Sequence, residues 1–92
     1  MKVAINSCYG GFGLSEAAYH ALGLEWDGYG YEYSNYERRT DLRLIEVIEA
    51  LGEKASGEYS KVKIVEIPDD VDWNIEEYDG MEWVAEAHRT WE

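Results

Sequence analysis

The residues with the clearest chemical potential form a glycine-rich turn near the amino end. Residues 6–15 read NSCYGGFGLS, with three glycines in four positions. Backbone N–H groups in such a turn, together with those at the start of a following helix, can form a cradle for an anion. The spacing matches neither the P-loop nor the dinucleotide fingerprint. The alternative is a strand-to-helix turn that simply needs the conformational freedom of glycine.

A cluster of arginines supplies the cations that an anionic ligand requires. Arg38, Arg39 and Arg43 place three of the eight Lys and Arg residues within six positions. Arginine binds phosphate or carboxylate in a two-pronged manner. In a chain this acidic, the alternative is that these arginines pair with nearby carboxylates such as Glu37 and Asp41.

The carboxyl-terminal tail combines a cation with an aromatic side chain. Arg89 and Trp91, next to His88, suit the recognition of a nucleotide base, because stacking on an aromatic ring contributes about 1–3 kcal/mol per base. Tyr9 and Phe12 are competing platforms, and the position of Phe12 between glycines favours a role other than core filling. The alternative for the tail is simple exposure to solvent.

The sequence evidence for catalytic residues is weaker than the evidence for a binding site. Cys8 lies between an expected strand and an expected helix, but no local signature joins it to His20 or His88 as a base. Three aspartates between positions 69 and 72 lack the spacing of a calcium loop. We therefore expect no enzyme, no catalytic residue, no metal and no cofactor. A hydrolase that uses Cys8 or the acidic residues is the alternative.

Composition and charge limit the range of partners. The 92 residues fit one domain, 1–92, and their net charge of -12 disfavours broad contact with a nucleic acid polymer or an anionic membrane. One cysteine excludes an internal disulfide, and the amino end lacks a secretory signal, so we expect a cytoplasmic protein. The thirteen aromatic residues (eight Tyr, four Trp and one Phe) exceed what a small core hides, which favours a homo-oligomer.

The periodicity of apolar residues predicts an α+β domain. We expect a small single-domain sheet of about four strands covered by two to three helices. Ser15 is expected to cap the first helix, and Thr40 or Asp41 the second. The expected strands cover residues 2–6, 29–33, 62–67 and 73–78, and the expected helices cover residues 16–22 and 42–51. A final helix is expected to begin at Asp79, with Trp83 and Val84 facing inward.

Four short blocks carry a resemblance to a known family. They are residues 6–15, 67–70 (IPDD), 77–80 (EYDG) and 88–91 (HRTW). In these blocks the chain resembles a family of small proteins encoded by bacteriophages and prophages, over nearly its whole length. It is also similar to phage anti-defence sponges of the Thoeris-inhibitor kind. Those are non-enzymatic oligomers that capture cyclic ADP-ribose-type or cyclic-nucleotide signals of bacterial immunity.

The resemblance implies a phage anti-defence protein that sequesters a small nucleotide-derived signal in the host cell cytoplasm. Such a protein needs a phosphate cradle, arginines and aromatic plates, and it needs no general base. The alternative is an acidic interaction protein that blocks a basic or nucleic-acid-binding host protein surface. The expected ligand-binding residues are Asn6, Tyr9, Gly10, Gly11, Phe12, Gly13, Ser15, Arg38, Arg39, Arg89 and Trp91.

Overall fold

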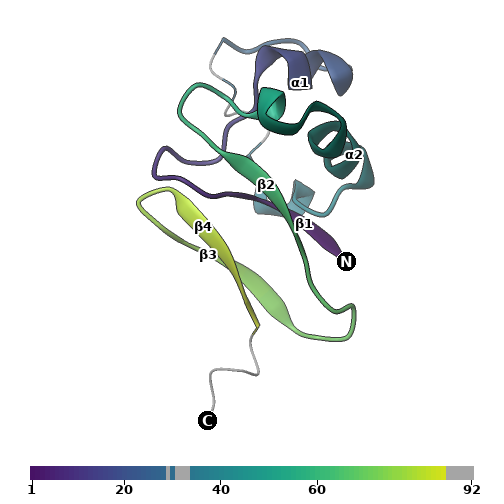
Figure 1. Ribbon diagram of the computed structural model, residues 1–92, viewed down its shortest axis with the longest axis vertical. Helices are drawn as coiled ribbons and strands as arrows, with labels where there is room; N and C mark the ends of the chain where they lie inside the picture. Colours follow the sequence, from purple (N-terminus) through teal and green to yellow (C-terminus); the bar gives the residue numbers. More distant parts are fainter. Residues whose placement is uncertain (29, 31–33, 87–92) are drawn as a thin grey trace.

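The computed structural model describes residues 1–28, 30 and 34–86, and these form a small α+β domain, as expected (Figure 1). The elements in chain order are β1 (Lys2–Asn6), α1 (Glu16–Ala21), the 3-10 helix η1 (Tyr36–Arg38), α2 (Leu42–Leu51), the 3-10 helix η2 (Gly52–Ala55), β2 (Val62–Glu66), β3 (Trp73–Tyr78) and β4 (Met81–Glu86). Instead of one sheet, the described strands make two antiparallel pairs, β1–β2 and β3–β4. None of the described helices is long and apolar enough to cross a membrane.

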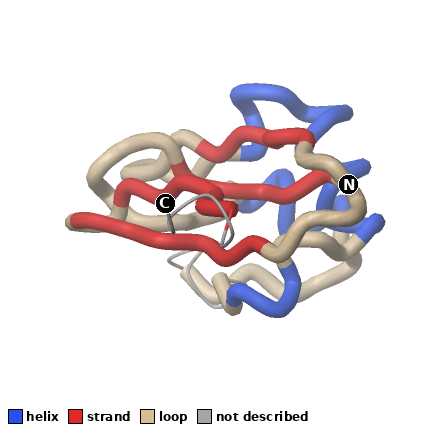
Figure 2. Tube along the Cα trace, turned by 90° about the horizontal axis from the view of Figure 1, so that it is seen from below, coloured by secondary structure: helices blue, strands red, loops and turns tan. Residues whose placement is uncertain are grey.

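The hydrophobic core lies between the β1–β2 pair and the helices. Figure 1 shows β1–β2 between the two α-helices and the β3–β4 hairpin, and Figure 2 shows the same strands from below. Ala4 and Val62 face the helices, whereas Val3 and Val65 are paired across the two strands. The core cluster is completed by Phe12, Leu14, Ala18, Tyr19, Leu44, Ile45, Val47, Ile48 and Ala55.

The helix boundaries follow the local capping signals. The Ser15 hydroxyl accepts a hydrogen bond from the Ala18 amide at the start of α1. Asp41 caps α2 in the same way, and Gly52 ends α2 with a φ of 59°. The expectations for these two helices are therefore confirmed.

The expected final helix is wrong, because residues 81–86 form strand β4. Asp79 and Gly80 both have positive φ, 54° and 89°, which is the backbone of a two-residue type I′ hairpin turn. The Asp79–Gly80 pair therefore turns the chain back along β3 instead of starting a helix. Trp83 is 42% exposed and is not the core residue we expected. The expected strand over 29–33 lies, apart from Gly30, outside the described residues.

Candidate binding cleft beside the glycine turn

A buried ion pair joins η1 to the β3–β4 hairpin. The side chain of Arg39 is 1% exposed, and its Nη1 and Nη2 groups donate to the two carboxylate oxygens of Glu82. Nη1 also donates to the carbonyl of Ala4, and Nε and Nη2 donate to that of Ser34. The guanidinium carbon lies 3.8 Å from the centroid of the Phe12 ring. All five N–H donors of Arg39 are therefore in use, and none is left for a phosphate.

The same pair closes the outer edge of β1. On the side away from β2, the Ala4 amide donates to the carbonyl of Arg39 at 2.8 Å. Two residues further along this edge, the Asn6 amide donates to Oε1 of Glu82 at 2.9 Å. An arginine and a glutamate from two distant segments thus take the place that a neighbouring strand occupies in a larger sheet.

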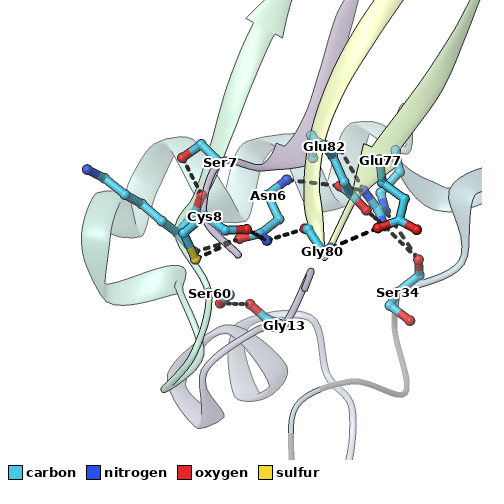
Figure 3. Close-up of polar contacts among 12 residues, drawn as sticks. Asn6, Ser7, Cys8, Gly13, Ser34, Ser60, Glu77, Gly80 and Glu82 are labelled. Atoms are coloured by element: carbon cyan, nitrogen blue, oxygen red, sulfur yellow. Dashed lines mark hydrogen bonds and ion pairs between the residues drawn. The ribbon is translucent and has the colours of Figure 1, made fainter. Parts of the chain in front are cut away.

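Asn6 is fully occupied inside the protein. Its Nδ2 donates to the carbonyls of Cys8 and Gly80, at 2.6 and 2.7 Å (Figure 3). Its Oδ1 accepts from the Lys61 amide at 2.8 Å and from the Cys8 thiol. The side chain is completely buried, so it links the glycine turn to the residue before β2 and to the hairpin and has no atom left for a ligand.

The glycine turn is held by close contacts with its neighbours. A Cβ on Gly10 would lie 1.6 Å from the Tyr59 carbonyl oxygen. A Cβ on Gly80 would lie 2.5 Å from the Gly11 nitrogen. Close packing therefore requires glycine at positions 10 and 80, whereas the conformational freedom that the sequence suggested is used at Gly11, which has a φ of 88°. Nevertheless, the amides of residues 10–13 have no hydrogen-bond partner among the described residues.

An open cleft of about 470 Å³ lies between this turn, η1 and the hairpin. It brings together four of the expected site residues, namely Gly10, Gly11, Phe12 and Arg39. Two carboxylates that we did not expect, Glu77 and Glu82, also line it. Figure 3 shows Glu77 and Glu82 side by side. One guanidinium and two carboxylates leave the cleft with a formal charge of -1.

Tyr36 forms an aromatic wall of the cleft. Its side chain is about half exposed, and the Arg39 guanidinium carbon lies 5.0 Å from the centroid of its ring. Partial burial raises the pKa of Tyr36, and the negative charges of Glu82 and Glu77 raise it further. The phenol is therefore neutral near pH 7 and available as a hydrogen-bonding group.

A second hollow, of about 700 Å³, lies on another side of the glycine turn. Tyr9 and Tyr59, which are 66% and 65% exposed, line it together with Gly10 and Lys61. Tyr9 is therefore separate from the cleft that holds Arg39. With Tyr78 and Trp83, these tyrosines are among the exposed aromatic residues, and the expected homo-oligomer stays a prediction.

The other expected site residues are dispersed. The hydroxyl of Ser15 caps α1 and donates to the Lys54 carbonyl, and the Gly13 carbonyl accepts from Ser60 and Gly57. Phe12 is 4% exposed in the core, so the expectation that it is not a core residue is wrong. Arg38 is exposed, unlike Arg39 next to it. Arg89 and Trp91 lie outside the described residues.

No protein-family model, curated protein or solved structure matches this chain. The function therefore has to be inferred from the geometry and charge of the cleft. Within residues 1–28, 30 and 34–86, no three His, Cys, Asp or Glu side chains gather as metal ligands would.

Sequence reasoning missed Tyr36, Glu77 and Glu82 as cleft residues. A usable signal was present, because Asp-Gly between two alternating segments is the strongest short-range indication of a hairpin. A hairpin at Asp79–Gly80 places Glu77 opposite Glu82 on one face. The pairing of Glu82 with Arg39 had no comparable signal.

Proposed function

We propose that this protein is a non-catalytic binding protein whose acidic surface occupies a positively charged surface of a partner protein. The observation that carries the proposal is the burial of Arg39 against Glu82. Arg39 is the only arginine among the described residues that lines the cleft, and its charge is neutralised within the protein. The net charge of -12 is therefore not offset at this site.

A net charge of this size affects the rate of association with a partner as well as the affinity. A strongly negative protein accelerates its encounter with a cationic partner and repels other anions. A basic partner surface is typical of proteins that bind nucleic acid, so occupying it would block nucleic acid binding. The phage-family resemblance supports a host protein as the partner, with action in the host cell cytoplasm.

This function is tested by titrating the protein with a short arginine-rich peptide. The control is a peptide of the same length in which glutamine replaces each arginine. We expect measurable binding at about 50 mM salt that weakens by about tenfold or more at about 300 mM, because mobile ions screen the attraction. A DNA oligonucleotide should compete for the peptide. Equal affinity for the glutamine peptide, or no response to salt, contradicts the proposal.

A second candidate function, the capture of a nucleotide-derived signal, is favoured by the glycine turn itself. The amides of residues 10–13 have no partner among the described residues, and Gly10 also lines the second hollow. There, Tyr9 and Tyr59 offer exposed rings for a base, and Lys61 offers a cation. Glu53 and Glu58 line the same hollow and oppose an anionic ligand.

Calorimetry with cyclic ADP-ribose isomers and cyclic oligonucleotides tests this second function. A true ligand should bind the unmodified protein and lose about tenfold in affinity with Tyr59→Ala, because stacking on one ring contributes about 1–3 kcal/mol. Tyr78→Ala, at a similarly exposed tyrosine outside the hollow, is the matched control. Absence of heat with every compound at high protein concentration contradicts this candidate.

A further inference from the structure

The hairpin places two carboxylates against each other. Glu77 and Glu82 are directly opposite in the β3–β4 register, so their side chains share one face of the hairpin. Like charges directly opposite each other destabilise a sheet. Glu82 is compensated by Arg39, which binds both of its oxygens. No described cation makes an ion pair with Glu77.

The Glu77 carboxylate is available to a ligand. Its Oε2 accepts a hydrogen bond from the Gly80 amide at 2.8 Å, which orients the group. Its Oε1 has no hydrogen-bond partner among the described residues. Glu77 is exposed and lines the same cleft as the half-exposed ring of Tyr36. An oriented carboxylate and an aromatic ring in one open cleft are suited to a cation.

The protein itself shows which cation fits this hairpin face. Arg39 lies over the Phe12 ring and binds the Glu82 carboxylate with two N–H groups. A guanidinium is planar, so it can stack flat on an aromatic ring and pair with a carboxylate through two parallel N–H groups, whereas an ammonium is a compact point charge without this geometry. Glu77 adds a second carboxylate beside Glu82, and the Tyr36 ring, whose centroid lies 5.0 Å from the Arg39 guanidinium carbon, is still about half exposed in the cleft.

We propose that the cleft binds one arginine side chain of the basic partner, with its guanidinium paired to Glu77 and packed against Tyr36. This inference rests on the proposed function, because it assigns the specificity of the same acidic surface. The bound group brings the formal charge of the cleft from -1 to zero. It also places a second guanidinium–carboxylate pair beside the Arg39–Glu82 pair.

The test compares two peptides of equal length and charge, one rich in arginine and one rich in lysine. We expect the arginine peptide to bind about tenfold more tightly, since a guanidinium can make two parallel hydrogen bonds to one carboxylate and an ammonium cannot. Glu77→Gln should weaken binding of the arginine peptide by about tenfold and remove the preference over lysine. Tyr36→Leu should reduce the same preference.

The adjacent residue provides a matched control. Glu76→Gln makes the same change in net charge, but Glu76 is opposite Trp83 on the other face of the hairpin. We expect this variant to bind the arginine peptide within about twofold of the unmodified protein. Equal losses in Glu76→Gln and Glu77→Gln would overturn the arginine site while leaving the proposed function in place. No binding of either peptide would instead remove the proposed function.

Discussion

Replacing Arg39 with alanine is expected to lower the free energy of unfolding by about 3–5 kcal/mol. The substitution leaves the Glu82 carboxylate buried without its cation and removes the donor to the Ala4 carbonyl. Domains of this size have a total stability of about 5–15 kcal/mol, so the loss is a large fraction of it. Urea denaturation followed by tryptophan fluorescence measures the change.

Two further variants distinguish the effect of breaking this buried ion pair from the effect of removing one positive charge. Arg43→Ala removes an exposed arginine and should change stability by no more than about 0.5 kcal/mol. The double variant Arg39→Met with Glu82→Leu should recover part of the loss, because a buried pair can be replaced by apolar side chains. Recovery is incomplete, since the Asn6 amide loses its acceptor. Equal free energies of unfolding for Arg39→Ala and Arg43→Ala would contradict a buried ion pair between Arg39 and Glu82.

Gly10→Ala is the second substitution with a large expected effect. The added methyl group would lie 1.6 Å from the Tyr59 carbonyl oxygen, a distance that requires a backbone shift in one of the two segments. We expect a loss of about 3 kcal/mol or more in the free energy of unfolding. Thermal unfolding monitored by circular dichroism measures it.

The neighbouring glycine is the control for backbone strain. Gly11 has a φ of 88°, but a Cβ at this position meets nothing within 4 Å. Gly11→Ala should therefore lower stability by only about 1–2 kcal/mol, the contribution of a left-handed backbone. Gly10 has no positive φ, so its larger effect comes from the steric contact alone. Equal stability losses for the two variants would contradict the close packing of Tyr59.

The elements set by neighbouring residues were predictable from the sequence. The three- and four-residue spacing of apolar side chains predicted α2, and Ser15 predicted the start of α1. Residues 79–82 were misread because Asp followed three positions later by Glu suggests a helix cap, whereas Asp-Gly suggests a hairpin turn. In the structure residues 81–86 are extended and Glu82 is buried against Arg39, a long-range contact that the local pattern does not indicate.

The candidate site was less predictable because its interactions are long-range. Arg38 and Arg39 look equivalent in the sequence, yet one is exposed and the other is 1% exposed. The partner of Arg39 lies 43 positions away, and that of the Asn6 amide 76 positions away. The glycine turn that we expected to bind an anion lines the cleft, but the sequence did not indicate the carboxylates that determine the charge of the cleft.

The closure of the β1 edge has a consequence during synthesis. Positions 39 and 82 are 43 residues apart, so at about 5–20 residues per second the ribosome needs about 2–9 s to make the second after the first. Throughout this interval the Asn6 amide lacks its Glu82 acceptor, so this part of the β1 edge is open to strands of other nascent chains. The molecule is thus most vulnerable to aggregation before its hairpin has been translated.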